Sequence, residues 1–381
     1  MANRKELPAG ITLRKDGRYM WRFKYDGQQY TGYSKKLTEA KKAMRNKRYE
    51  VEHGIYGKEK NVSFSAWFEE WLETYKKPVL KESTYDLYLK TYQWHIKPVF
   101  GTQKIKSLRT EQIQRFMNDM AREYSKTVAA TVNFLLYDSL QQAARNRIIA
   151  QNPMENTTPP KYTTPEPKKA LTPQHEKELL EAVKDSQYFP VYRAATLSGM
   201  RIGELLGLKW ECVDFDREEI RVRNTLSYIS GKGMYLDTPK SAASRRMIPM
   251  NKAGELFKLM KARHLKQLQD RLKAGKYWDP LPGMETLVFT TTAGRPLYDV
   301  NIRTHHKKVI KQLQAAGSDI PMHTFHTLRH CFATRCIEAG MDPKTLQAIL
   351  GHSTMAMTMD LYCDVMEETK REAMKKVQAI L

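Results

Sequence analysis

The sequence predicts a multidomain α+β protein: a small three-stranded β-sheet with one helix, then a helical domain, then a mainly α domain with a small β-sheet. Two Asp-Gly pairs separate runs of β-forming residues near the N-terminus. Apolar residues at helical spacing dominate from residue 63 to residue 152, and a Pro- and Thr-rich segment follows. A chain of 381 residues is long enough for two or three such domains.

The composition predicts a folded protein outside the membrane. Hydrophobic residues make up 41% of the chain and aromatic residues 10%, which is enough to form hydrophobic cores. No apolar run approaches the length needed to span a bilayer, and the N-terminus lacks the apolar stretch of a signal peptide. The four cysteines form no CxxC pair, which is typical of reduced thiols. We therefore expect a cytoplasmic protein without a membrane partner.

The charge favours a polyanionic partner. The chain carries 64 Lys and Arg against 42 Asp and Glu, a net charge of +22. Basic side chains that neutralise phosphates release condensed counterions, so nucleic acid is the leading candidate. An anionic membrane surface or ribosomal RNA remains the alternative at this point.

The N-terminal residues 1–58 predict a three-stranded meander followed by a helix. Asp16-Gly17 and Asp26-Gly27 both lie between runs of β-forming residues, which is a strong hairpin signal. The helix is expected from Thr38, because apolar residues then recur at helical spacing. Its predicted buried stripe is Ala40, Ala43, Met44 and Val51.

Basic residues interleaved with aromatic ones are expected on the exposed face of this sheet. They are Arg14, Lys15, Arg18, Arg22 and Lys24. Such strands suit a DNA groove, while an ordinary solvated sheet face is the alternative. The high local charge favours DNA, and these five residues are our candidate DNA-binding residues.

Residues 63–155 predict a four-helix domain. Ser63 is a candidate N-cap, Glu82 and Thr110 open further helices, and a long fourth helix is expected from about Ser125 towards Ile149. The aromatic stripes of these helices are expected to form the core. Residues 156–169 are rich in Pro and Thr and predict an interdomain linker, after which residues 170–381 form the last domain.

Five polar groups stand out in the last domain. Arg201 follows a glycine at a helix start, and Lys240 lies in a basic turn bounded by predicted strands. His326 and Arg329 share one helical face, His352 follows a short helix, and Tyr362 comes ten residues later. Each of these has an ordinary structural explanation when taken alone.

A metal site is not expected here. His326 and His330 have the i,i+4 spacing of a zinc-protease helix, but the glutamate that acts as base in those enzymes is missing. Arg329 would also repel a cation at that face.

Taken in order, the polar groups suit phosphodiester transfer. Two arginines can hold the non-bridging oxygens of a phosphate, and a tyrosine hydroxyl can act as the nucleophile. A lysine on a turn can donate a proton to the leaving 5′-oxygen. The sequence shows no dense Asp/Glu cage for a metal, which fits a route that needs no metal cofactor.

The ordered motifs resemble the tyrosine recombinase (phage integrase) family. They are Gly-Met-Arg201-Ile-Gly-Glu-Leu, Pro-Lys240-Ser, His326-Thr-Leu-Arg329-His330, Leu-Gly-His352-Ser and Leu-Tyr362. The helical domain resembles the family's core-type DNA-binding domain. The N-terminal domain resembles the arm-type DNA-binding domain of integrases from conjugative transposons and Gram-positive phages.

The resemblance implies a role for each residue. Tyr362 would attack the phosphate and form a 3′-phosphotyrosyl link, while Arg201 and Arg329 would clamp it. Lys240 would protonate the 5′-hydroxyl, His326 would assist proton transfer, and His352 would hydrogen-bond the phosphate.

At the level of the whole protein, the resemblance implies a site-specific DNA recombinase that integrates and excises a mobile element through a Holliday junction, without metal or ATP. The implied partners are double-stranded DNA at core-type and arm-type sites, three further copies in a homotetramer, an excisionase and a host DNA-bending protein. The location implied is bacterial and nucleoid-associated. One departure is Asp364, where relatives often have His.

Alternatives remain open. A chromosome-dimer resolvase or a type IB-like topoisomerase would share the chemistry, although neither needs a basic arm domain. A DNA-binding regulator without activity is the rival from another class, but every catalytic position is filled. The final residues 371–381 have apolar side chains at helical spacing and are expected to dock on a neighbouring protomer, with packing on their own domain as the alternative.

Overall fold

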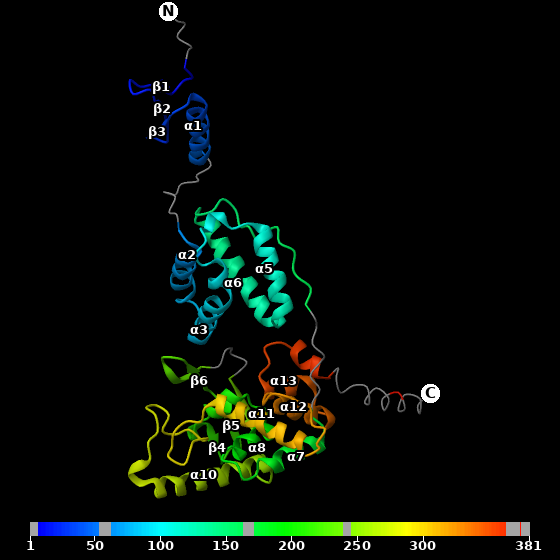
Figure 1. The fold of residues 1–381 in the computed structure, drawn as a ribbon. Helices are drawn as coiled ribbons and strands as arrows, with labels where there is room; N and C mark the ends of the chain where they lie inside the picture. Colours follow the sequence, from blue (N-terminus) through cyan, green and yellow to red (C-terminus); the bar gives the residue numbers. More distant parts are fainter. Residues whose placement is uncertain (1–6, 53–61, 163–170, 239–244, 363–373, 375–381) are drawn as a thin grey trace, which may run out of the picture. The chain divides into compact units, whose positions relative to one another are not determined.

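The computed structural model describes residues 7–52, 62–162, 171–238, 245–362 and 374. The chain divides into two compact units, Met1–Pro165 and Glu166–Leu381 (Figure 1). No helix within the described ranges is long and apolar enough to cross a membrane. Lys240, Asp364 and all of residues 371–381 except Met374 lie outside these ranges.

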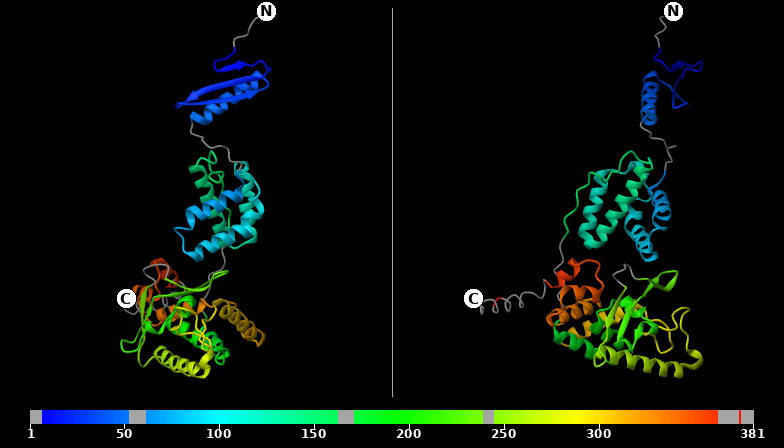
Figure 2. Two further views of the ribbon diagram at one scale, coloured as in Figure 1. Left: turned by 90° about the vertical axis from the view of Figure 1, so that its left-hand side faces the viewer. Right: turned by 180° about the vertical axis from the view of Figure 1, so that it is seen from behind.

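The N-terminal residues form the predicted meander and helix. The elements are β1 (Ile11–Leu13), β2 (Tyr19–Tyr25), β3 (Gln28–Ser34) and α1 (Leu37–Glu52). The three strands pair antiparallel in chain order, and α1 packs along one face of the sheet (Figure 2). Ile11, Trp21 and Ala40 are buried between sheet and helix.

The second Asp-Gly pair forms the tight hairpin expected from the sequence. Tyr25 pairs with Gln28, so Asp26 and Gly27 alone make the turn between β2 and β3. Both have positive φ, 47° and 75°, which is the type I′ conformation that matches the twist of the strands.

The helical domain begins at a serine cap, as predicted. Its helices are α2 (Phe64–Trp71), α3 (Glu82–Thr91), α4 (Lys97–Phe100), α5 (Thr110–Glu123) and α6 (Lys126–Arg145). The side chains of Ser63 and Ser125 accept hydrogen bonds from the backbone N–H groups of Ala66 and Val128. Trp67, Phe68 and Trp71 are buried in its core. The described start of the Pro- and Thr-rich segment contacts this core through Tyr162.

The second unit is mainly helical, with two small sheets. Its helices are α7 (Pro173–Ala182), α8 (Phe189–Ser198), α9 (Ile202–Leu206), α10 (Glu255–Ala274), α11 (Asp299–Ala315), α12 (Thr327–Glu338) and α13 (Pro343–Leu350). The strands β4 (Val213–Asp214), β5 (Glu219–Val222) and β8 (Arg246–Pro249) form one sheet, and β6 (Thr225–Ile229) pairs with β7 (Gly233–Asp237). The predicted α+β fold class is therefore confirmed.

Candidate active site

The turn between α8 and α9 brings two of the predicted residues together. α8 ends at Gly199, whose φ is 61°, and a Cβ at this position would lie 2.4 Å from the ring of Phe332. Only glycine fits this close approach in a left-handed conformation. The Gly199 carbonyl accepts a hydrogen bond of 2.8 Å from Arg329 Nη1, and Arg201 follows two residues later at the start of α9.

Three arginines converge on the C-terminal end of α13. Arg246 donates to the carbonyl of Ile349, Arg329 Nη2 to that of Leu350 at 2.6 Å, and Arg201 Nη2 to that of Gly351 at 3.3 Å. The last carbonyls of a helix have no partner within the helix and carry partial negative charge. The three acceptors are consecutive in the chain, so this helix end holds all three guanidiniums in one place.

Glu204 is the buried carboxylate that these arginines share. Its side chain is 3% exposed and accepts hydrogen bonds of 2.8 Å from both Arg201 Nη1 and Arg246 Nη2. Burial by itself would raise the pKa of Glu204, but the hydrogen bond and charge of Arg246 and the charge of Arg201 outweigh it and lower the pKa. The carboxylate is therefore ionised.

The arginines carry more positive charge than Glu204 balances. Arg329 is 3% exposed, and burial together with the charge of Arg201 lowers its pKa to about 9, despite the opposing effect of Glu204. Arg201 keeps 35% of its side chain exposed. A buried group of cations with one open side is suited to binding an anion from solvent.

The two predicted histidines lie in the same positive field. Desolvation, followed by the charges of Arg329 and Arg201, lowers the pKa of His352 to about 4. His326 keeps an exposed surface, yet desolvation of the ring and the neighbouring His330 and Arg329 lower its pKa to about 4 as well. Both imidazoles are therefore neutral at pH 7 and can accept or donate a proton.

Tyr362 is described, but its hydroxyl lies elsewhere. It donates a hydrogen bond to the backbone carbonyl of Met341, in the loop between α12 and α13. Its ring is 8% exposed and packs with Ala333 and Leu346. Desolvation and the charge of Asp342 raise the pKa of this hydroxyl. Within the described ranges, no hydrogen bond joins it to an arginine.

The structure thus brings together Arg201, His326, Arg329 and His352. Lys240 lies outside the described residues, and strands β7 and β8 come before and after its segment, as expected. Arg246, the first residue of β8, was not singled out from the sequence; the basic segment that leads into this strand was the only sequence feature that pointed to it. No group of three or more His, Cys, Asp or Glu side chains suited to a metal occurs in the part of the chain that is described.

A buried histidine of α11, His306, makes a prediction about acid stability. His306 is 1% exposed, both of its ring nitrogens lack a hydrogen-bond partner, and burial and His323 lower its pKa to about 3. The unfolded chain binds more protons than the folded one between pH 6.5 and about 3, so stability falls as the pH falls through this window.

His306→Phe should remove this pH dependence, because it keeps a ring against Tyr192 and Phe325 but cannot be protonated. We expect the variant to retain about 2 kcal/mol of unfolding free energy that the wild type loses between pH 7.5 and pH 5. Urea unfolding at the two pH values measures it. Equal losses in the two proteins would show that His306 does not titrate on unfolding.

The five candidate DNA-binding residues of the N-terminal domain are all exposed. Arg22 and Lys24 alternate along β2 with the buried Trp21, so they lie on the face of the sheet opposite α1. The guanidiniums of Arg14 and Arg18 lie 5.2 Å and 6.0 Å from the centre of the Tyr33 ring. Arg14, Lys15 and Arg18 lie in the turn between β1 and β2 rather than on the strands, and Arg14 and Arg18 form ion pairs with Asp16. Of the five predicted residues, the structure therefore places Arg22 and Lys24 on the outer face of the sheet.

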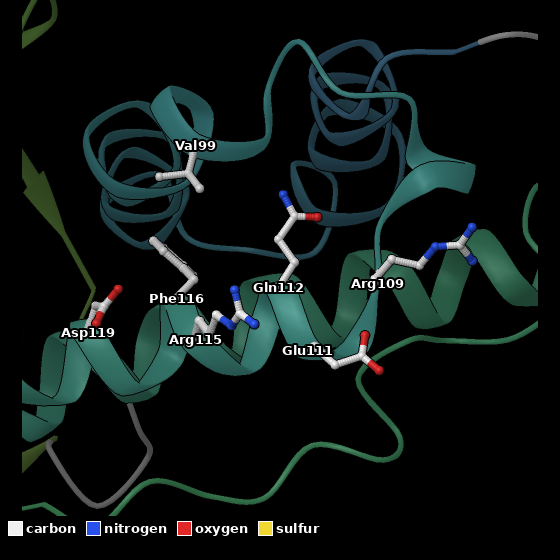
Figure 3. Close-up of a pocket in the computed structure, with 7 residues that line it drawn as sticks. All are labelled: Val99, Arg109, Glu111, Gln112, Arg115, Phe116 and Asp119. Carbon is white, nitrogen blue, oxygen red and sulfur yellow. The ribbon is translucent and has the colours of Figure 1, made fainter.

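A further basic surface and a mixed-charge pocket were not predicted. Exposed lysines of α11 line a shallow groove along one side of this helix: Lys307, Lys308 and Lys311. In the helical domain, an open pocket lies between α4 and α5, and Phe116 in it points toward Val99 (Figure 3). Its charged lining is balanced, with two basic and two acidic residues: Arg109, Arg115, Glu111 and Asp119.

Comparisons with known proteins identify the family. The Phage integrase family model matches residues 169–369, and the model of the phage integrase N-terminal SAM-like domain matches residues 63–121. The tyrosine recombinase XerC-like protein of Caldanaerobacter subterraneus subsp. tengcongensis is 29% identical over 366 residues, which span 91% of this chain and 90% of that protein.

Solved structures show the same fold. The Tn1549 transposon integrase in complex with transposon right end DNA is 23% identical, with a TM-score of 0.67 over 83% of this chain and 100% of that one. A lambda integrase tetramer bound to a Holliday junction is 18% identical, with a TM-score of 0.57 over 94% and 96%. Because the family model covers more than half of the sequence, the chain belongs to the phage integrase family and is a tyrosine recombinase.

Proposed function

We propose that this recombinase integrates and excises a mobile element by way of a 3′-phosphotyrosyl DNA intermediate and a Holliday junction. The observation that carries the proposal is the group of three guanidiniums around the single buried carboxylate Glu204, with two neutral histidines beside it. This arrangement has the charge and the donors that a scissile phosphate requires. The Tn1549 transposon integrase and the lambda integrase, whose structures were solved with DNA, support the same substrate.

In the proposed reaction, Arg201 and Arg329 hold the two non-bridging oxygens of the scissile phosphate. The Tyr362 oxygen bonds to phosphorus, the bond from phosphorus to the 5′-oxygen breaks, and the tyrosine proton passes to a base such as His326. Lys240 donates a proton to the leaving 5′-oxygen, and His352 donates a hydrogen bond to the phosphate. The guanidiniums stabilise the transition-state charge that Mg²⁺ neutralises in other phosphoryl transfers.

Religation reverses these steps without ATP. The phosphotyrosyl link retains a phosphodiester's energy, so the 5′-hydroxyl of a partner strand can displace Tyr362. Two such rounds exchange both strands through a Holliday junction, which requires four active sites and hence a tetramer on two DNA sites. An excisionase and a host DNA-bending protein complete the proposed assembly.

The position of Tyr362 implies that the nucleophile moves before it reacts. Its hydroxyl must leave the Met341 carbonyl to reach a phosphate held by the arginines. Because Tyr362 packs between α12 and α13, the same movement detaches its ring from Ala333 and Leu346. We propose that assembly on DNA provides the interactions that replace these contacts.

The proposal is tested with nicked DNA that carries the element's terminal sequence. Cleavage releases the short strand beyond the nick, so the covalent intermediate cannot religate and accumulates. We expect an adduct in the presence of EDTA and without ATP. An adduct that forms only with Mg²⁺ would contradict the metal-free route, and DNA binding without an adduct under any condition would favour a regulator.

The N-terminal domain is proposed to bind arm-type sites through the outer face of its sheet. Deletion of residues 1–58 should leave cleavage at core-type sites intact but reduce integration of a substrate that carries arm sites. Arg22→Ala with Lys24→Ala should weaken arm binding and lower its salt dependence by about one unit per cation. Equal integration by the full and shortened chains would favour a resolvase or topoisomerase instead.

Lys240 is proposed to be the acid, which a chemical rescue can test. Lys240→Ala should cleave ordinary DNA about 10² to 10⁴-fold more slowly, the range for a general acid. A substrate with sulfur at the 5′-bridging position should restore the rate, because a thiolate leaves without a proton. If the rate stays low with sulfur, the acid is another residue.

A further inference from the structure

Helix α10 buries Leu256, Phe257 and Met260 in its first turns, but from Arg263 onwards it presents leucines to solvent and polar residues to the core. Leu265, Leu268 and Leu272 are 61%, 47% and 83% exposed. They lie at i, i+3 and i+7, which places them in one stripe along the helix. On the opposite side, Arg263 and Gln267 are less than 10% exposed. In this part of α10 the pattern is the reverse of that expected for a helix that covers a domain.

Hydrogen bonds from the buried polar side chains fix this orientation of α10. Arg263 Nε donates to the carbonyl of Val288 at 2.9 Å, and Gln267 Nε2 donates to that of Leu287 at 2.9 Å. Gln267 also accepts from the indole N–H of Trp210. Rotating the helix to bury its leucines would break all of these bonds, so the leucines remain outside in the folded domain.

The exposed stripe is surrounded by positive charge. The exposed basic residues of α10 are Lys258, Lys261, Lys266, Arg271 and Lys273. Its exposed acidic residue is Glu255, in the first turn, where it pairs with Lys258. A second copy of this face would bring like charges together, and the leucines have no counterpart on a DNA backbone. The surface therefore complements a partner that is both apolar and acidic.

The stripe also lies away from the candidate active site. Within the second unit, α10 runs along the side opposite α13 and the β6–β7 hairpin, which the views of Figures 1 and 2 show consistently. The proposed reaction uses no residue of this helix. A partner could therefore occupy α10 without blocking the phosphate site.

We propose that the leucine stripe of α10 is a docking site for an acidic amphipathic helix of another protein. The partner's apolar residues would cover Leu265, Leu268 and Leu272, and its carboxylates would face the flanking lysines and arginines. This is the helix-on-helix mode of recognition, in which an apolar seam gives affinity and flanking charges select the partner.

The test uses two synthetic helical peptides and the full chain. Both peptides carry the same leucine stripe, flanked by glutamates in one and by lysines in the other. We expect the glutamate peptide to bind at least about tenfold more tightly in fluorescence anisotropy. Combining Leu265→Ser, Leu268→Ser and Leu272→Ser should weaken this binding at least about tenfold. The matched control is Leu87→Ser, which changes an equally exposed leucine of α3 and should bind like the wild type.

The substitutions touch only exposed positions, so thermal unfolding and adduct formation should stay at wild-type levels. Equal binding of the two peptides, or binding that survives the triple substitution, would overturn the proposal. Two other results would also overturn it and name another occupant. If the wild type forms dimers and the triple variant does not, the occupant is a second copy of this chain. If the wild type binds phosphatidylglycerol vesicles and the triple variant does not, the occupant is a membrane surface.

Discussion

Tyr362→Phe is expected to abolish covalent capture of nicked DNA, with a loss of at least about 10⁴-fold, because the substitution removes the nucleophilic oxygen and no other atom. DNA binding should be unchanged. Stability should change by only about 1 kcal/mol, since the hydroxyl makes one hydrogen bond, to the Met341 carbonyl. Denaturing gels of wild type and variant on the same nicked substrate measure the effect.

The matched control is Tyr298→Phe, which removes the hydroxyl of an exposed tyrosine in the same unit. It should form the adduct at the wild-type rate. An adduct that persists in Tyr362→Phe would assign the nucleophile to another tyrosine. The buried Tyr362 would then contribute only to the packing of the domain.

Glu204→Gln is expected to destabilise the second unit by about 3–5 kcal/mol, the cost of removing one partner from a buried ion pair. The substitution keeps the shape of the side chain but leaves Arg246, 4% exposed, without its carboxylate. Urea unfolding at pH 7.5 measures the change. Cleavage should also fall, because Arg201 loses its bond to the carboxylate.

Glu219→Gln provides the control for this prediction. Glu219 pairs with Arg221, whose side chain is 37% exposed, so losing the pair should cost only about 0–1 kcal/mol. A loss below about 1 kcal/mol in Glu204→Gln as well would mean that solvent or the α13 carbonyls already balance the arginines. The buried carboxylate would then not organise the site.

Local features of the fold could be predicted because neighbouring residues determine them. The turn at Asp26 and Gly27, the cap at Ser63 and the start of the fourth helix near Ser125 depend on a few adjacent positions, and all formed as expected. Pro98 does not end the helical backbone: α3 continues through a π-helical turn, Tyr92–Ile96, into α4, and Pro98 follows that turn.

Features that depend on distant segments could not be predicted. Arg246 enters the site because its guanidinium reaches the carbonyl of Ile349, 103 positions further along the chain. The exposure of Leu265, Leu268 and Leu272 depends on the carbonyls at positions 287 and 288, which hold the polar side of α10 against the core and lie outside the helix's own sequence. The contact of Tyr362 with the Met341 carbonyl likewise depends on how α12 and α13 pack.

The most direct test of the account is to identify the residue that carries DNA in the adduct formed with EDTA. Protease digestion and mass spectrometry of the trapped wild-type adduct would locate the modified side chain. We predict a nucleotide linked through its 3′-phosphate to Tyr362 and to no other of the 20 tyrosines. A link to a different residue, a 5′-phosphate link, or an adduct that requires Mg²⁺ would contradict the proposed mechanism.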